Sequence, residues 1–143
     1  MPRLLTGPTI LVLDDNERAQ AIWHGILSAI GVAHVGAADL RTAQDLLAMH
    51  DIDLVVIDEH LADPQSPGSD LALWIRESND AAITGMPVIA CTSDQTPAVR
   101  ARLLAAGVSV VLAKPIDAQA VLLSLEELLH HPRLATSSPV TPR

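Results

Sequence analysis

Short aliphatic runs alternate along the chain with segments whose apolar residues follow a helical spacing. Five runs have the length of a buried strand and end at a turn-forming or charged residue; they cover residues 9–13, 32–37, 54–57, 88–92 and 108–113. Four of them are unbroken and rich in branched side chains, which is typical of parallel strands covered on both faces. The run at 32–37 is weaker and predicts a less buried strand.

The segments between the runs repeat their apolar residues every three or four positions, which predicts helices. Five such segments occur, over residues 17–31, 39–50, 69–78, 96–107 and 117–131. Gly31 is a natural helix stop, and Asp39 is placed to cap the second helix. Thr96 followed by Pro97 is a typical start for the fourth helix.

Strands that alternate with helices of this length predict repeated βαβ units. We therefore expect an α/β fold in which a doubly wound, five-stranded parallel sheet carries five flanking helices. A chain of 143 residues suits one domain of this kind, which we expect over residues 8–131. Residues 132–143 are rich in Pro, Ser and Thr without periodicity, and we expect a flexible C-terminal tail there.

Composition and charge narrow the classes of function. The formal net charge of -8 argues against a basic surface that binds nucleic acid. The single cysteine, Cys91, cannot form an intramolecular disulfide, and we expect it to be an inert thiol in the core. No apolar run approaches the roughly 20 residues of a membrane span, so we expect no membrane contact and a cytoplasmic location.

Reactive side chains stand where four of the predicted strands end. The first strand is followed by Asp14 and Asp15, the third by Asp58, the fourth ends at Thr92, and the fifth is followed by Lys114. In a doubly wound sheet, ligands bind outside the carboxyl ends of the strands. If the three carboxylates meet there, their mutual repulsion favours a bound hard cation, for which Mg²⁺ is the natural candidate.

The same group of residues suits phosphoryl transfer. A lysine supplies a positive charge for a phosphoryl oxygen, a threonine supplies a hydroxyl, and an aspartate can act as nucleophile beside the cation. Phosphoryl transfer needs little beyond this positioning and neutralisation of charge.

Four motifs in this order resemble the receiver domain of two-component response regulators. They are "ILVLDDN", "LVVIDEHL", "PVIACTSD" and "VVLAKPI", and the resemblance covers about residues 8 to 130. Each motif is weak by itself, but the four together, each at a strand end, are highly specific. The resemblance implies the flavodoxin-like (βα)5 fold with phosphoryl chemistry at one end.

The resemblance also implies the role of each site residue. Asp58 would be the phosphoacceptor, and Asp14, Asp15 and Asp58 would bind Mg²⁺ together with the backbone carbonyl of His60. Thr92 would be the switch hydroxyl, Lys114 would contact the phosphoryl group, and Pro115 would follow it in the cis form. Glu59 is expected to be a solvated neighbour of the site.

Two features depart from the pattern of the family. Val111 occupies the position of the switch aromatic, three residues before Lys114, and the chain has no Tyr or Phe to replace it. The segment 59–69 after the phosphoacceptor is longer than the common form. Leu123 falls among charged positions of the last helix, where an exposed leucine would be weak support for a partner or dimer surface.

The leading functional hypothesis is a single-domain response regulator. It would accept a phosphoryl group from a histidine kinase or a histidine phosphotransfer protein and signal through protein contact or a phosphorelay, as a monomer or weak dimer. It would not be an enzyme beyond its own phosphorylation and autodephosphorylation. The alternatives are a pseudo-receiver that binds partners without phosphorylation and a small Mg²⁺-dependent phosphohydrolase with an aspartyl nucleophile, for which no segment is long enough to form a cap.

Overall fold

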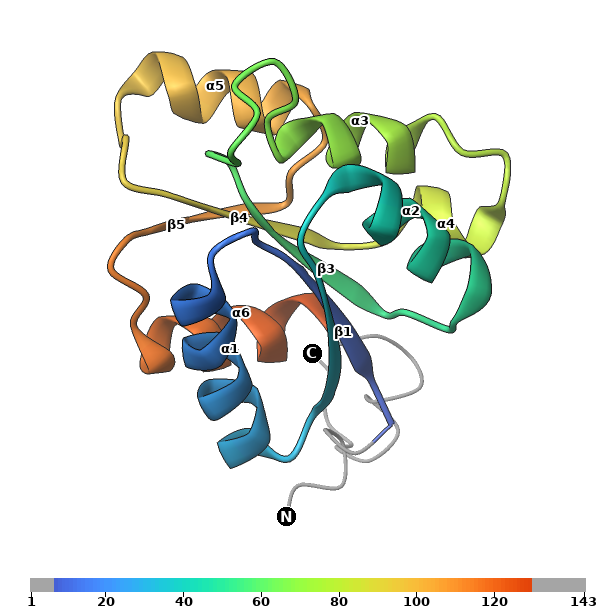
Figure 1. Ribbon diagram of the computed structural model, residues 1–143, viewed down its shortest axis with the longest axis vertical. Helices are drawn as coiled ribbons and strands as arrows, with labels where there is room; N and C mark the ends of the chain where they lie inside the picture. Colours follow the sequence, from blue (N-terminus) through green and yellow to red (C-terminus); the bar gives the residue numbers. More distant parts are fainter. Residues whose placement is uncertain (1–6, 130–143) are drawn as a thin grey trace, which may run out of the picture.

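A computed structural model describes residues 7–129, which form a single parallel sheet with helices on both faces (Figure 1). The strand order is β2-β1-β3-β4-β5. The strands are β1 (Thr9–Leu13), β2 (Ala33–Ala37), β3 (Leu54–Asp58), β4 (Val88–Thr92) and β5 (Val110–Ala113). This confirms the predicted doubly wound, five-stranded α/β fold.

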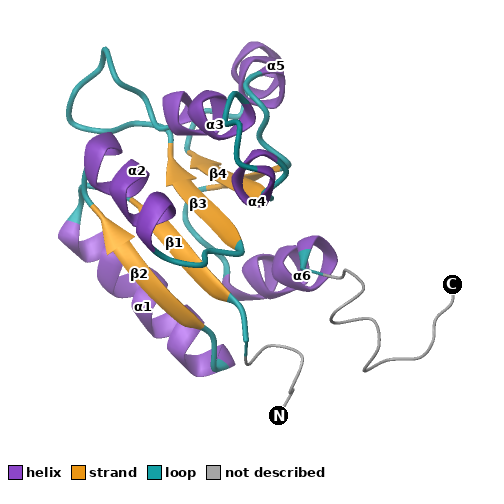
Figure 2. Ribbon diagram, turned by 90° about the vertical axis from the view of Figure 1, so that its right-hand side faces the viewer, coloured by secondary structure: helices purple, strands orange, loops and turns teal. Residues whose placement is uncertain are grey.

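The helices divide between the two faces of the sheet (Figures 1 and 2). One face is covered by α1 (Glu17–Ile30) and α6 (Ala118–Leu128). The other is covered by α2 (Leu40–Met49), α3 (Ser69–Arg76), α4 (Ala81–Thr84) and α5 (Pro97–Ala105). Both faces of the central strands are therefore buried, as their unbroken apolar runs require.

Alternate residues of each strand point into two separate cores. In β3, Leu54 and Val56 belong to the core under α1 and α6, whereas Val55 and Ile57 belong to the core under α2, α3 and α5. This division follows from the two-residue period of a strand. It also determines which face each side chain at the end of a strand will occupy.

Helix starts follow the predicted caps. The side chains of Asp39 and Thr96 accept hydrogen bonds from the backbone N–H groups of Thr42 and Val99, and Gly31 ends α1 in the left-handed conformation with φ of 88°. These caps satisfy backbone groups that the helices leave unpaired. The predicted helix starts and the stop at Gly31 are thus confirmed.

The prediction of five flanking helices was incomplete, because a sixth, α4, lies between α3 and β4. It has four residues and begins after Asp80, whose side chain accepts a hydrogen bond from the N–H of Ala82. A helix of one turn offers too few positions for a periodic pattern, so the sequence could not indicate it. The fifth strand also begins at Val110 rather than at residue 108.

The C-terminal end of the predicted domain lies beyond the described residues. The last helix ends at Leu128, and residues 130 and 131 of the predicted segment lie outside the described part of the chain, as does the expected tail at 132–143. Across residues 7–129, none of the helices combines the length and the apolar character needed to traverse a lipid bilayer.

Candidate functional site

The parallel pairing of β1 and β3 brings Asp14 and Asp58 to the same edge of the sheet. Leu13 pairs with Ile57, so Asp14 and Asp58 occupy the next position on their two strands. Each lies two positions after a residue that points toward α1 and α6, Val12 in β1 and Val56 in β3, so both occupy that face. The next strand along the chain, β2, pairs on one side of β1, and the one after it, β3, pairs on the other. The carboxyl ends of β1 and β3 are therefore the topological switch point, where such folds bind ligands.

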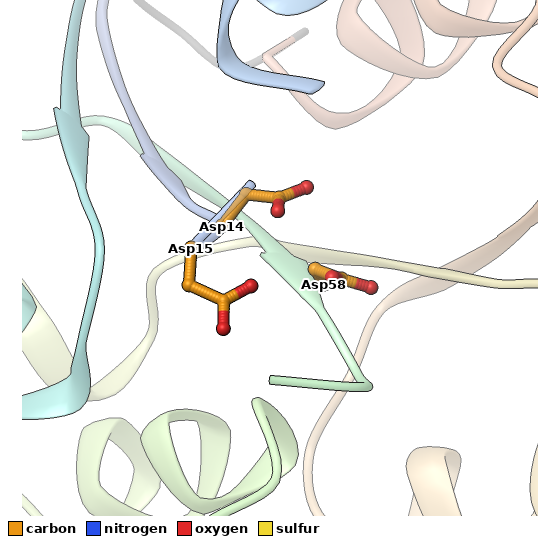
Figure 3. A group of neighbouring side chains, drawn as sticks. All are labelled: Asp14, Asp15 and Asp58. Carbon is orange, nitrogen blue, oxygen red and sulfur yellow. The ribbon is translucent and has the colours of Figure 1, made fainter. Parts of the chain in front are cut away.

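Three carboxylates meet at this edge (Figure 3). Asp14, Asp15 and Asp58 each offer one oxygen, and these oxygens lie within 4.8 Å of one another. Asp14 and Asp58 are buried, whereas Asp15 is half-buried. The structure therefore brings together the three acidic residues that the sequence singled out.

The acidic group is held by backbone hydrogen bonds. The N–H of Asn16 donates to Asp14 Oδ1 at 3.0 Å, and the N–H of Ala62 donates to Asp15 Oδ2. Burial raises the pKa of Asp14 above its usual value, and the negative charge of Asp58 adds to this effect against the opposing hydrogen bond from Asn16. A cation at this position would relieve the cost of keeping the carboxylates charged.

Lys114 reaches the group from the end of β5. Its Nζ lies 2.7 Å from Oδ1 of Asp58, and its side chain is one-third exposed. Burial of the ammonium opposes its charge, but the hydrogen bond and attraction of Asp58 outweigh this and raise the pKa of Lys114. Its peptide bond to Pro115 is cis, as the sequence resemblance implies.

Thr92 ends β4 and is fully buried. It directly follows Cys91, the β4 residue that pairs with Asp58, so it reaches the same edge of the sheet. Its hydroxyl oxygen accepts a hydrogen bond from the N–H of Asp94 at 3.0 Å, and its carbonyl accepts one from the Gln95 side chain at 2.9 Å. The hydroxyl is thereby fixed at the start of the connection that leads into α5.

An open cleft of about 410 Å³ leads to the three carboxylates and Lys114. Its lining includes Asp14, Asp15, Asp58, Lys114 and the exposed His60, whose N–H donates to Asp58 Oδ1 at 3.3 Å. The first turns of α1 and the connection between β5 and α6 form its walls. A small phosphorylated group can approach Asp58 from this side.

Gln20 supports the site from α1, a role that the sequence did not indicate. Its amide Nε2 donates to the carbonyl oxygens of Val12, Asp14 and Ala37 at 3.1, 2.9 and 3.2 Å. These bonds link the first turns of α1 to the ends of β1 and β2. A single glutamine inside an amphipathic helix carries no pattern that would distinguish it from a solvated residue.

A backbone hydrogen bond joins the two ends of the segment 59–68, which directly follows Asp58. Gly68 donates its N–H to the carbonyl of Glu59, and a Cβ at Gly68 would lie 2.1 Å from the carbonyl oxygen of Asp58. Only glycine permits this close approach of two backbones. Residues 59–68 therefore begin and end beside Asp58 before α3 starts at Ser69.

The expectation that Glu59 is solvated was wrong. Its side chain is 2% exposed, and it accepts hydrogen bonds from the N–H and the hydroxyl of Ser69 at 2.9 and 3.1 Å. The guanidinium of Arg102 on α5 also donates to it. Because a buried carboxylate needs such partners, Glu59 joins β3, α3 and α5 next to the acceptor.

Three further residues that the sequence singled out differ in their burial. Cys91 is buried, which confirms its core position, and this burial raises the pKa of its thiol to about 12. Leu123 on α6 is 55% exposed, as expected from its charged neighbours. Val111 is half-buried and packs on the core beneath α5.

Residues 10–126 match the family model of the response regulator receiver domain. Among curated proteins, the chain is similar to the autoinducer 2 sensor kinase/phosphatase LuxQ of Vibrio vulnificus strain YJ016. The two are 29% identical over 124 residues, which are 87% of this chain and 14% of LuxQ. The chain therefore spans about one seventh of the length of that relative.

A shorter relative and a solved structure match along most of their length. The polar-differentiation response regulator DivK of Brucella ovis is 25% identical over 109 residues, which are 76% of this chain and 85% of DivK. The receiver domain of the sensor histidine kinase PA1611 from Pseudomonas aeruginosa PAO1 has a TM-score of 0.77 and 25% identity over 88% of this chain and all of that domain. That crystal structure contains a magnesium ion coordinated in its active site cleft.

Proposed function

Because this chain belongs to the response regulator receiver domain family of two-component systems, we propose that it accepts a phosphoryl group on Asp58 and thereby transmits a signal. The observation that carries the proposal is the position of Asp58. It is a buried carboxylate within 4.8 Å of two others, and its oxygen lies 2.7 Å from the Lys114 ammonium. This arrangement combines a nucleophile with charge neutralisation, as phosphoryl transfer requires.

The acidic residues fit Mg²⁺ as the cofactor. Asp14, Asp15 and Asp58 would hold the cation through carboxylate oxygens, and the carbonyl of His60 remains a predicted further ligand. Mg²⁺ prefers a small number of carboxylates and keeps places for water and phosphoryl oxygens. When bound, it neutralises negative charge on the transferred group. The raised pKa of Asp14 supports this fit, since it reflects a carboxylate that burial and neighbouring charge make costly to ionise.

The transfer step needs few further groups from the chain. An oxygen of Asp58 attacks phosphorus and forms a new P–O bond, while the bond from phosphorus to the donor nitrogen breaks and its electron pair stays with the donor imidazole. Lys114 is positively charged, Asp58 favours this charge by raising its pKa, and the ammonium can move from Asp58 to a phosphoryl oxygen. Thr92 can donate its hydroxyl hydrogen to another phosphoryl oxygen.

The donor would be a phosphohistidine on a histidine kinase or a histidine phosphotransfer protein. This follows from the family and from the names of the relatives, one a sensor kinase/phosphatase and one a response regulator. The output would be a protein contact or onward transfer of the phosphoryl group. Reaction in the cytoplasm and a monomeric or weakly dimeric state remain predictions.

A small phosphoramidate donor tests this proposal by intact-mass measurement. With Mg²⁺, the wild-type chain should gain one phosphoryl group and then stop, whereas Asp58→Asn should gain none at a comparable rate. A pseudo-receiver would gain none in either form. Continued release of phosphate from a generic phosphomonoester would instead support the phosphohydrolase alternative.

A further inference from the structure

Two histidines lie side by side between α1 and the edge strand β2, away from the carboxylates. His34 lies on the edge strand β2 and pairs in register with Ile10, whose side chain belongs to the core under α1 and α6. Paired residues of parallel strands point to the same face, so His34 faces α1. His24 on α1 lies over it, and Nδ1 of His24 is 3.0 Å from Nε2 of His34.

The packing on either side of the pair fixes its position. One helical turn before His24, Gln20 is held by three carbonyl oxygens and lies against Gly36, two residues beyond His34. On the other side, the N–H of Val32 donates to the carbonyl of Leu27 at 3.0 Å and closes the turn between α1 and β2. The two imidazoles therefore come from rigid elements that are anchored both before and after them.

One N–H···N hydrogen bond joins the two rings. At this distance one ring nitrogen donates an N–H and the other accepts it with its lone pair. Burial lowers the pKa of His34, and the charge that His24 can carry lowers it further. A lone pair directed at a neighbouring imidazole is thus kept available near neutral pH, while His24 remains exposed to solvent.

The spacing of the two nitrogens also suits a metal ion. Bonds from zinc to imidazole nitrogen are about 2.0–2.1 Å long, so two of them separate the nitrogens by about 2.9 Å at a right angle and about 3.4 Å at a tetrahedral angle. The observed 3.0 Å falls between these values. Imidazole is a preferred ligand of Zn²⁺, Cu²⁺ and Ni²⁺, whereas Mg²⁺ prefers oxygen.

We propose that His24 and His34 form a two-nitrogen chelating site for a divalent transition metal, of which Zn²⁺, Cu²⁺ and Ni²⁺ are the candidates. The ion lies off the line between the two nitrogens and takes the place of the hydrogen bond that joins the rings, and water or a ligand from another molecule completes its coordination at the exposed side. The site is separate from the acidic residues and differs from them in its choice of metal.

Chelation predicts a specific pattern among variants. If one ion needs both rings, either substitution alone removes the tight site and leaves at most the weak binding of the remaining ring. If the rings bind independently, each single variant loses only its own share. Holding a second ligand in place commonly strengthens binding by roughly 100-fold over one ligand.

Zn²⁺ binding followed by isothermal titration calorimetry tests the proposal, in excess Mg²⁺ to occupy the carboxylates. A background with His130→Ala and His131→Ala removes an adjacent histidine pair from the competition. In it, His24→Gln and His34→Gln should each bind Zn²⁺ about 100-fold more weakly, and the double variant, which lacks both rings, should bind no more tightly than either. His50→Gln, which changes an exposed histidine elsewhere, should bind as the background does.

Circular dichroism of the metal-free variants shows whether each is folded. We expect all of them to fold, because His24 is exposed and His34 is half-buried at the edge of the sheet. Equal Zn²⁺ affinity in the background and in His24→Gln would overturn the proposal. A second contrary result is that each single variant loses only part of the Zn²⁺ binding and the double variant loses the sum of the two parts, since this would mean separate one-ligand sites.

Discussion

Arg102 on α5 donates to the buried carboxylate of Glu59, the residue that directly follows Asp58. This ion pair connects the end of β3 to the last turn of α5, the helix that follows Thr92. The side chain of Arg102 is 51% exposed, while that of Glu59 is 2% exposed. The carboxylate therefore depends on the pair more than the guanidinium does.

Replacing Arg102 by glutamine should destabilise the protein. Glu59 would keep its two hydrogen bonds from Ser69 but lose its charged partner, which predicts a loss of roughly 1–3 kcal/mol in the free energy of unfolding. Arg100→Gln changes an exposed arginine of the same helix and should stay within about 0.5 kcal/mol of wild type. Urea denaturation measures both, and equal midpoints for the two variants would show that the ion pair contributes nothing.

A second prediction concerns Gly68. In Gly68→Ala, the new Cβ would lie 2.1 Å from the carbonyl oxygen of Asp58, so the backbone must shift at the acceptor itself. We expect a loss of roughly 1–3 kcal/mol, as for other overpacked positions, and slower labelling by a small phosphodonor.

Gly25→Ala is the matched control. It lies inside α1 with nothing within 4 Å of an added Cβ, so helix propensity predicts a gain of about 0.5–1 kcal/mol. Thermal unfolding compares the two variants. If Gly68→Ala is as stable as Gly25→Ala, the close approach to Asp58 is not a constraint on the native chain.

The sequence predicted the sheet and the acidic site because both follow from local patterns. Unbroken apolar runs indicate buried strands, and a residue that directly follows such a run must lie at the carboxyl end of the sheet. Asp14, Asp58 and Lys114 could therefore be placed before their distances were known. The one-turn helix α4 had no period to detect.

The contacts that support the site could not be predicted in the same way. Glu59 and Arg102 are 43 residues apart, and His24 and His34 come from a helix and an edge strand. Such pairs depend on how helices lie on the sheet, which alternation along the chain does not specify. Gln20 and Ser69 likewise act through partners that only the folded chain brings near.

A third prediction follows from the raised pKa of Asp14. The folded protein holds a proton on this carboxyl more tightly than the unfolded chain does, so the Mg²⁺-free protein should lose stability as pH rises from the ordinary aspartate pKa through the raised one. Asp14→Asn lacks this loss and should melt at a higher temperature than wild type at neutral pH without Mg²⁺.

Added Mg²⁺ should reverse that order. A cation that binds only the folded wild type at about 100 times its Kd adds about 2.7 kcal/mol, whereas Asp14→Asn and Asp15→Ala should gain much less. Melting temperatures with and without Mg²⁺ give the comparison. A wild-type melting temperature that does not change when millimolar Mg²⁺ is added would contradict a metal site at these carboxylates.

A fourth prediction concerns Val111, which stands in place of an aromatic residue. A valine has one stiff torsion and no ring that could change its place when Thr92 moves. A ligand shifts an equilibrium only through contacts that differ between two states, and one such difference is missing here. Beryllofluoride, a mimic of the phosphoryl group, should therefore perturb backbone amides around Asp58, Thr92 and residues 59–69 more than those of residues 108–125. Equally large shifts in both regions would show that the distal face switches without an aromatic.

The identity of the phosphorylated residue tests the account most directly. The chain should be treated with a small phosphoramidate and Mg²⁺, digested under conditions that preserve acyl phosphates, and mapped by tandem mass spectrometry. We predict a single phosphoryl group on Asp58, with Asp14, Asp15 and Glu59 unmodified and no label when Mg²⁺ is removed. A phosphoryl group on another residue, or labelling of the Asp58→Asn variant at the wild-type rate, would contradict the central claim.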